Sequence, residues 1–229
     1  MPEITDRCSK RSPVKGARTT GRSGSTNGAA MRVAPVGIAF AERPLGALVD
    51  AVFQSAHVTH NTTVAIAGAS AVAAAVSAGV SGASLAGALD LAVEAAALGA
   101  GRGFYFAGAD VATRSRWALE LVQGKGEDEA LDLIYTLVGT GVATNEAVPA
   151  AIAVCSLAPD DPWRVCRLAA SLGGDCDTVA AIAGAIMGAC HGAGAFPRDA
   201  VLALEAANPE LKLKTLAAAL LALRAKGTG

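Results

Sequence analysis

The amino-acid sequence predicts an all-α protein, in which one multi-helix domain follows a basic N-terminal arm. Apolar residues recur every three to four positions in most segments, and no segment shows the strict alternation that is typical of a strand. Hydrophobic residues make up 52% of the 229, so the chain can bury a sizeable core. Only 4% of the residues are aromatic and 26 are glycine, which indicates a core of small aliphatic side chains between closely spaced helices.

Residues 1–24 show neither a helical nor a strand period and are predicted to be a disordered arm, so that the helical domain covers residues 25–229. The first 32 residues contain seven basic and two acidic residues, although the net charge of the whole chain is −1. The basic residues are sparser than in a typical nucleic-acid-binding arm, and the near-neutral chain gives no electrostatic case for nucleic acid as a partner.

The five cysteines form no Cys-x-x-Cys pair and no spacing typical of metal ligands, which favours a cytoplasmic location. No apolar segment typical of a secretory signal follows the N-terminal charges. Residues 61–89 are uncharged and exceed the length of about 20 residues that a membrane span needs. They consist mainly of Ala, Gly, Ser and Thr, which gain little from lipid, so we expect a buried helical hairpin and no membrane partner.

The helical period predicts helices over residues 44–57, 84–99, 110–123, 127–137, 150–156 and 179–189, an Ala-rich helix that begins at residue 62, and an amphipathic helix over 205–226. Trp117 is expected on a buried face and Tyr135 in an apolar stripe. Residues 139–149 are predicted to be a loop. Asp160 and Asp161 precede a proline and an apolar helix, so we interpret them as a helix cap. Gly184, Gly188 and Gly192 are expected to form a face for close helix packing.

The segment Gly173-Gly174-Asp175-Cys176-Asp177-Thr178 precedes one of the apolar helices. Two glycines permit a turn with positive φ, and two carboxylates and a hydroxyl follow within four residues. If the segment is a tight turn, the three oxygens can converge, and such hard donors suit Mg²⁺ or Mn²⁺. The same residues can instead cap the helix. From the residues alone the two interpretations are about equally supported.

Two further segments carry weaker signals. Asn27-Gly28-Ala29-Ala30 opens a short helical run that Pro35 limits, and the backbone N–H groups of such a turn suit a phosphate, although a plain loop is the default interpretation. His60 stands at the entry to the Ala-rich helix, where a lone histidine is more often a capping or packing residue than a ligand.

Together these segments resemble the ADP-ribosylglycohydrolase family, which includes the dinitrogenase-reductase-activating glycohydrolases and the ADP-ribosylarginine and ADP-ribosylserine hydrolases. The resemblance rests on the residues from Asn27 to Pro35, on Thr59-His60, and on the Gly-Gly-Asp-x-Asp-Thr turn with its Ala/Ile/Gly helix and Phe196-Pro197. It implies a compact orthogonal multi-helix fold and a hydrolase that removes ADP-ribose from a protein or small-molecule conjugate. The metal in that family assists hydrolysis of the glycosidic bond.

The resemblance also implies roles for single residues. Asp175, Asp177 and Thr178 would supply half of the ligands of a binuclear Mg²⁺ or Mn²⁺ centre, and no catalytic residue beyond these ligands is assigned. The other implied residues contact the substrate: Asn27, Gly28, Ala29 and Ala30 at the diphosphate of ADP-ribose, and His60 at the edge of the cleft.

The resemblance covers about residues 25–200, which correspond to the C-terminal part of the family domain. The N-terminal part of that domain, with a Thr-Asp-Asp-like cluster, is expected to be missing, because residues 1–24 contain no such cluster. Cys176 also stands where the family usually has threonine. An impaired homologue that binds ADP-ribose or has a structural role therefore remains an alternative, as does a misleading resemblance. The linkage cleaved, the preferred metal and the oligomeric state are not predicted.

Overall fold

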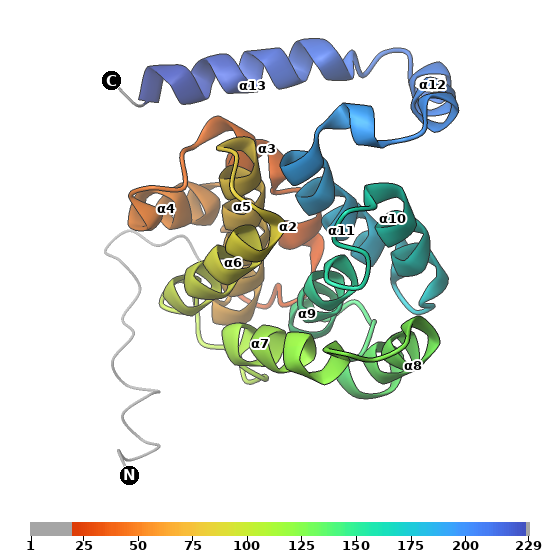
Figure 1. Ribbon diagram of the computed structural model, residues 1–229. Coiled ribbons are helices and arrows are strands. Elements are labelled where there is room, and N and C mark those ends of the chain that lie inside the picture. The colour runs from red at the N-terminus through yellow and green to blue at the C-terminus, as the bar shows by residue number, and fades with distance from the viewer. Residues whose placement is uncertain (1–19, 228–229) are drawn as a thin grey trace.

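The computed structural model describes residues 20–227, and residues 1–19 of the predicted arm lie outside this range (Figure 1). The last five residues of that arm, 20–24, are described and belong to the packed structure. The amide of Asn61 donates a hydrogen bond to the carbonyl of Gly21 at 2.8 Å, and the Thr62 hydroxyl donates to the carbonyl of Gly24 at 2.7 Å. These bonds fix residues 20–24 against the start of the Ala-rich helix.

The predicted all-α fold is confirmed. The described residues form α2 (Gly28–Met31), α3 (Ala34–Ala39), α4 (Leu45–Ala56), α5 (Thr63–Val80), α6 (Leu85–Gly99), α7 (Val111–Val122), α8 (Glu127–Leu133), the π-helical turn η1 (Ile134–Val138), α9 (Thr144–Cys155), α10 (Pro162–Ser171), α11 (Cys176–His191), the 3₁₀ turn η2 (Ala193–Ala195), α12 (Arg198–Ala207) and α13 (Leu213–Gly227). Extended pairing in this range is limited to two isolated bridges, Thr26 with Ala143 and Thr62 with Phe104.

Helix α5 is the centre of the fold and packs against α2, α3, α4, α6, α9 and α11 (Figure 1). It is the one described helix that is long and apolar enough to cross a membrane, but 94% of that apolar window is buried inside the structure. It forms the predicted hairpin with α6, where a Cβ added to Gly99 would lie 2.6 Å from Ser70 Oγ. Because glycine stands there, the two helices approach more closely than larger side chains would allow.

Helix α9 begins at Thr144, so the prediction of a loop up to Pro149 is wrong for residues 144–149. A proline inside a helix removes one backbone hydrogen bond, which usually disfavours the helix. Here α9 is packed between α7, α11 and α5, and its residues from Ala147 to Cys155 are buried. This tertiary packing offsets the lost bond.

Four other predictions are wrong in detail. Trp117 is 39% exposed instead of buried, and Tyr135 is 55% exposed because the chain changes from α8 into the wider turn η1 just before it. The predicted helix over residues 205–226 is interrupted between α12 and α13, where Pro209 follows Asn208 and Lys212 has a φ of 43°. Gly192 does not belong to the packing face, since it ends α11 with a φ of 79°.

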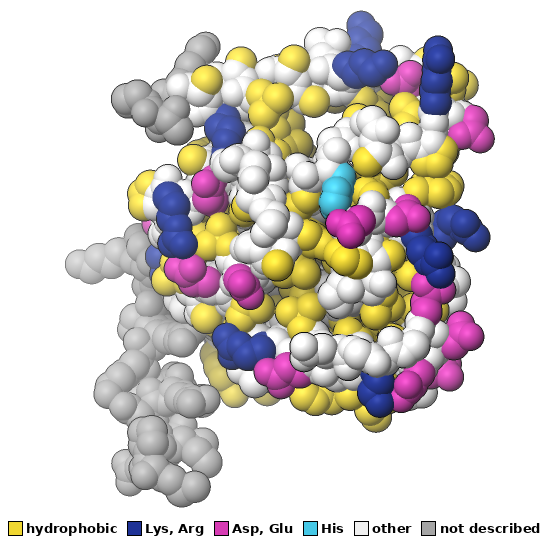
Figure 2. All heavy atoms as spheres, in the orientation of Figure 1, with side chains coloured by type: hydrophobic (Ala, Val, Ile, Leu, Met, Phe, Trp, Pro, Cys, Tyr) yellow, Lys and Arg dark blue, Asp and Glu magenta, His cyan; other side chains and the backbone are white. Residues whose placement is uncertain are grey.

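Helix α13 lies across the top of the molecule in Figure 1 and contacts α3. Its attachment is polar: the guanidinium of Arg224 is 2.8 Å from a Glu42 carboxylate oxygen and also contacts the carbonyl of Phe40 and the Ser77 hydroxyl. On the face drawn in Figure 2, acidic and basic side chains are interspersed around the molecule.

Candidate functional site

The segment that begins at Asn27 and the Gly-Gly-Asp turn, which lie far apart in the sequence, meet in the structure. Asn27, at the start of α2, donates a side-chain hydrogen bond from Nδ2 to Oδ2 of Asp175, at the start of α11, over 2.5 Å. The two residues are 148 positions apart. Asn27 is 4% exposed and Asp175 is partly buried. The contact therefore fixes one oxygen of Asp175 and leaves its second oxygen for another partner.

The glycine turn is built as the sequence predicts, but it is shorter. Gly173 and Gly174 have φ values of 78° and 67°, in the left-handed region that favours glycine. The amide of Asp175 then donates to the carbonyl of Thr140 at 2.7 Å. Helix α11 begins at Cys176 and not at Val179, so the second carboxylate and the threonine lie in the first helical turn.

The three oxygen-bearing side chains differ in their surroundings. Thr178 is 6% exposed, and its hydroxyl donates weakly to the sulfur of Met31 on α2, at 3.8 Å. Asp177 is exposed, and within the described residues its carboxylate has no hydrogen bond or ion pair. Asp175 and Thr178 thus both face α2, whereas the carboxylate of Asp177 is open to a ligand.

The capping interpretation can be compared with the other helices. Helices α5, α6, α7 and α10 are capped by the side chains of Thr62, Ser84, Asp110 and Asp161, each of which accepts from an amide three residues ahead. The predicted cap at Asp161 is thereby confirmed. Asp175 occupies the same position on α11, but its side chain caps no amide and accepts from Asn27 instead. The structure therefore does not support capping as the role of Asp175.

Only some of the backbone amides at the start of α2 donate hydrogen bonds to other described residues. The amide of Asn27 donates to the carbonyl of Val142 at 2.9 Å and so is not free. For the amides of Gly28, Ala29 and Ala30, no acceptor outside α2 is found among residues 20–227. The first amides of a helix have no acceptor within it, so these groups can accept an anion as a partner.

His60 packs directly on this helix start. Its Nε2 lies 3.0 Å from the hydroxyl of Thr26 and its Nδ1 lies 2.8 Å from the hydroxyl of Thr59, which also accepts from Arg32 at 2.7 Å. A Cβ added to Gly28 would lie 2.9 Å from the imidazole ring, so only glycine allows this approach. Burial, and secondly the charge of Arg32, lower the pKa of His60 from its ordinary value, which favours a neutral ring.

A third segment of the site, which is not among the residues predicted from the sequence, runs from Gly139 to Thr144. The amide of Gly141 donates to the carboxylate of Glu146 at 3.1 Å, and the hydroxyl of Thr144 donates to the carbonyl of Ser25 at 2.9 Å. In the sequence, this segment is marked only by two glycines around a threonine. That pattern predicts a loop but gives no sign of the residues that the loop contacts.

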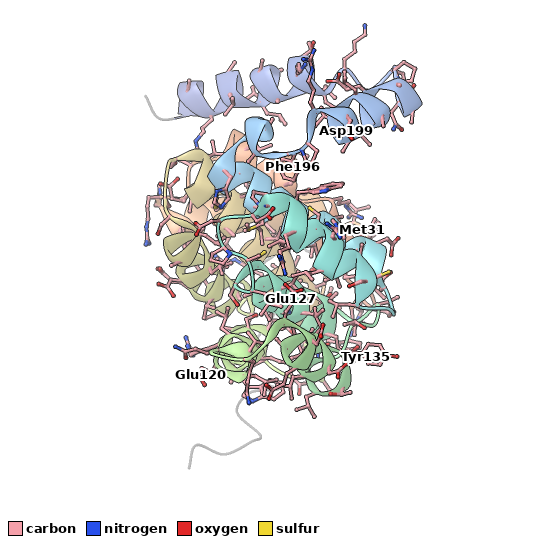
Figure 3. The ribbon with its side chains drawn as sticks, turned by 45° about the vertical axis from the view of Figure 1, so that its right-hand side comes forward. Met31, Glu120, Glu127, Tyr135, Phe196 and Asp199 are labelled. Atoms are coloured by element: carbon pink, nitrogen blue, oxygen red, sulfur yellow. The ribbon has the colours of Figure 1, made fainter. Side chains whose placement is uncertain are left out.

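Exposed apolar side chains flank the acidic turn. Met31 is 52% exposed, Tyr135 55% and Val142 58%. Figure 3 shows Met31 and Tyr135 along the same side of the molecule, and a Cβ added to Gly173 would be 3.5 Å from the Tyr135 ring. The polar groups around Asp175 therefore lie at a surface with apolar edges.

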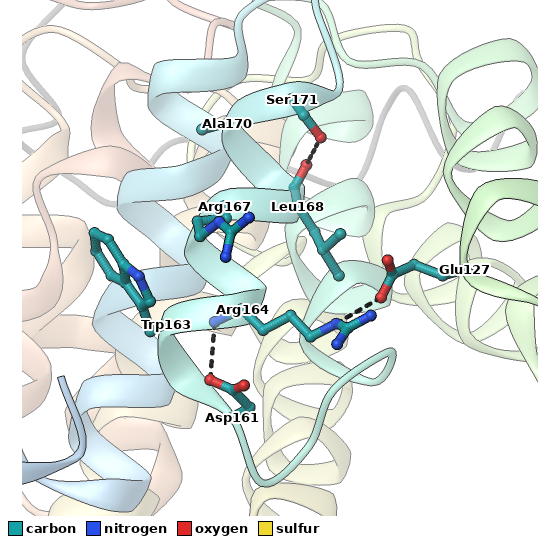
Figure 4. Close-up of a pocket in the computed structure, with 8 residues that line it drawn as sticks. All are labelled: Glu127, Asp161, Trp163, Arg164, Arg167, Leu168, Ala170 and Ser171. Atoms are coloured by element: carbon teal, nitrogen blue, oxygen red, sulfur yellow. Dashed lines mark hydrogen bonds and ion pairs between the residues drawn. The ribbon is translucent and has the colours of Figure 1, made fainter. Parts of the chain in front are cut away.

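A hollow of about 610 Å³ lies elsewhere, along α10 near the start of α8 (Figure 4). Arg164 pairs there with Glu127 at 2.8 Å, while Trp163 lies on another side of α10. No residue of the acidic turn, of the α2 start or of the Gly139–Gly141 loop lines this hollow. We therefore do not assign the candidate site to it.

Three of the cysteines, Cys155, Cys166 and Cys190, are partly or fully buried. Burial raises the pKa of Cys155, Cys166 and Cys190, so these thiols stay protonated near neutral pH. Among residues 20–227, no three His, Cys, Asp or Glu side chains form a cluster that could hold a metal ion. The oxygen donors at the start of α11 are two carboxylates and one hydroxyl, which fit Mg²⁺ or Mn²⁺ in kind, provided that water or substrate oxygens complete the coordination shell.

Comparison with known proteins gives two findings. Residues 5–228 match the family model described as ADP-ribosylglycohydrolase, a wider range than the motifs indicated. The uncharacterized protein YegU of Escherichia coli (strain K12) is 37% identical over 187 residues, which are 81% of this chain and 56% of YegU. The chain therefore spans little more than half the length of that relative.

Proposed function

The chain belongs to the ADP-ribosylglycohydrolase family, and we propose that it binds the ADP-ribose part of a protein or small-molecule conjugate and hydrolyses its glycosidic bond with a divalent metal. Family membership supports a hydrolase of this type. The observation that carries the finer proposal is the hydrogen bond from Asn27 to Asp175, because it joins a phosphate-type turn to an acidic turn. ADP-ribose, with a diphosphate beside a ribose, offers groups of both kinds.

The start of α2 would bind the diphosphate. The amides of Gly28, Ala29 and Ala30 find no acceptor outside their helix in the described structure, and a helix start favours negative charge. The Asn27 amide N–H is already bonded to Val142, so the contribution of Asn27 would come from holding Asp175.

Asp175, Asp177 and Thr178 would hold Mg²⁺ or Mn²⁺. Asp175 is not used as a cap, and the Asp177 carboxylate is exposed without a partner among the described residues. When bound, such a cation polarises sugar oxygens and stabilises negative charge. Asn27 would orient the Asp175 carboxylate, and the buried Thr178 hydroxyl would face the same side.

His60 would border the ribose. Its ring is neutral near neutral pH because burial and Arg32 lower its pKa, and a neutral imidazole can donate to and accept from hydroxyl groups. Its two nitrogens already lie beside the hydroxyls of Thr26 and Thr59, and Arg32 holds Thr59, so the ring would border the sugar in a fixed orientation.

A second candidate function is binding of ADP-ribose without hydrolysis. It stays a candidate because two carboxylates and a hydroxyl are the protein donors proposed for the metal, so hydrolysis depends on water or substrate oxygens to complete the six ligands of Mg²⁺. For either function we propose a cytoplasmic location, which is supported by the four described cysteines being free thiols.

Isothermal titration of the chain with ADP-ribose, with and without Mn²⁺, tests the binding step. We expect heat of binding in both conditions and tighter binding with Mn²⁺. Incubation with ADP-ribosylated arginine and serine peptides, followed by measurement of free ADP-ribose, separates the two candidates. Binding without release of ADP-ribose would support the second function, and no binding in either condition would contradict both.

A further inference from the structure

The carboxylate of Glu146, in the first turn of α9, is enclosed by the Gly139–Gly141 loop. The amide of Gly141 donates to Glu146 Oε2 at 3.1 Å. Gly139 has a φ of 85°, and a Cβ added there would lie 2.9 Å from the carboxyl carbon of Glu146. The loop can close around this side chain because glycine stands at both contact points.

The same loop contacts both halves of the candidate site. The carbonyl of Thr140 accepts from the amide of Asp175 at 2.7 Å, and a Cβ added to Gly174 would be 2.5 Å from Thr140. Two residues further, the carbonyl of Val142 accepts from the amide of Asn27. The loop therefore lies between the two residues whose side chains form the 2.5 Å hydrogen bond.

The geometry points to Glu146 as a positioning residue: it fixes the Gly139–Gly141 loop and thereby the placement of the Asp175 carboxylate toward Asn27 and a metal ion. This inference rests on the proposed function, since it deepens the role of the acidic turn. The Oε2 atom of Glu146 accepts from the Gly141 amide, and we give this side chain no role as a metal ligand. Mutation of a residue that orients a metal ligand typically lowers metal affinity or activity by about 10–100-fold.

To hold the loop, the side chain at position 146 must be long enough to contact Gly141 and must carry an acceptor oxygen. Glutamine has the same length and can accept from Gly141 through its amide oxygen, so Glu146→Gln keeps the loop bond. Aspartate keeps the charge but is one methylene shorter, so Glu146→Asp loses the contact. Glu146→Ala removes the acceptor entirely. Glu120→Ala, which changes an exposed glutamate on α7 that Figure 3 places far from Met31, is a matched control.

Two readouts test the inference on the full chain. Hydrogen exchange of the Asp175 amide reports whether the turn is still held by Thr140, and electron paramagnetic resonance of free Mn²⁺ reports metal affinity. We expect the Ala and Asp variants to exchange this amide at least tenfold faster and to bind Mn²⁺ about tenfold more weakly. The Gln variant and the Glu120→Ala control keep wild-type values in both.

Unchanged exchange of the Asp175 amide in Glu146→Ala and Glu146→Asp overturns the inference. It is also overturned if the amide exchanges faster while the Mn²⁺ affinity stays the same. If the wild-type chain binds no Mn²⁺, the metal part of the proposed function fails, and the exchange measurement still decides whether Glu146 holds the turn. Should Glu146→Ala fail to fold, the comparison of Gln with Asp decides the same question.

Discussion

Asn27 Nδ2 and Asp175 Oδ2 lie 2.5 Å apart at the meeting point of α2 and α11. This contact is the polar link between the first and last motifs of the site. Asn27 is 4% exposed, and its replacement leaves the partly buried carboxylate of Asp175 without this hydrogen-bond donor. The contact therefore serves both the fold and the orientation of Asp175.

Two substitutions of Asn27 test this contact, one by removing the hydrogen bond and one by placing a second carboxylate beside Asp175. Asn27→Ala is expected to lower the free energy of unfolding by about 1–3 kcal/mol, because Asp175 loses a hydrogen bond in a partly buried place. Asn27→Asp is expected to cost more at pH 7, where two carboxylates would face each other, than at pH 4, where one can be protonated. Urea unfolding at the two pH values measures both. A pH-independent cost for Asn27→Asp would contradict the close approach of the two side chains.

Removal of a carboxylate from the acidic turn is expected to abolish stabilisation by metal. If Asp175 and Asp177 bind Mn²⁺, then Asp175→Ala and Asp177→Ala lose any rise in melting temperature that Mn²⁺ gives the wild type. Asp161→Ala is the matched control, since Asp161 caps α10 through the Arg164 amide. It is expected to cost about 1 kcal/mol of stability while keeping the Mn²⁺ shift. Retention of the shift in both acidic-turn variants would indicate that Mn²⁺ binds elsewhere.

His60 is expected to make stability depend on pH in a defined direction. Its pKa is lowered in the folded state by burial and by Arg32, so the unfolded chain binds the proton more tightly. The folded state is therefore fully stable above the ordinary pKa of about 6.5 and loses stability as the pH falls below it. His60→Gln should flatten this part of the curve in denaturant unfolding between pH 7.5 and 5. An unchanged slope in His60→Gln would rule out this assignment.

Arg224 is expected to attach α13 to the rest of the molecule. Its side chain is 12% exposed and that of Glu42 is 26% exposed. Although burial raises the pKa of Glu42, its hydrogen bond from Ser81 and the nearby Arg224 keep that pKa below its ordinary value. Arg224→Ala should speed amide exchange throughout α13 and lower stability by about 1–3 kcal/mol, without changing ligand binding at Asp175. Slow exchange of α13 in this variant would show that apolar contacts with α3 are sufficient.

The Arg224–Glu42 pair gives a second pH dependence of stability, with the same sign as that of His60 but in a lower pH range. Because the pKa of Glu42 is lowered in the folded state, its contribution to stability is present above its ordinary value of 4.5 and is lost as the pH falls below it. Glu42→Gln should reduce the loss of stability in acid. Comparison with His60→Gln distinguishes the two groups, because their pH ranges differ.

Local sequence was sufficient for the elements whose signals lie within a few residues. The long periodic helices and the cap at Asp161 could be predicted, because a helix face and its capping bond involve residues three or four apart. The acidic turn could also be located from its two glycines and two aspartates. What its side chains contact could not, because the partner of Asp175 stands 148 positions away.

The tertiary structure decided the remaining features. Helix α9 continues through Pro149 because its neighbours bury it. The Gly139–Gly141 loop encloses the Glu146 carboxylate, because α9 begins at Thr144 and not after Pro149. The sequence by itself therefore determined an all-α chain, its family and the residue types of the site. Only the packing of α2, α9 and α11 around α5 brought Asn27, Thr140 and Asp175 together, since hydrogen bonds between distant segments depend on where helices pack and not on their local propensity.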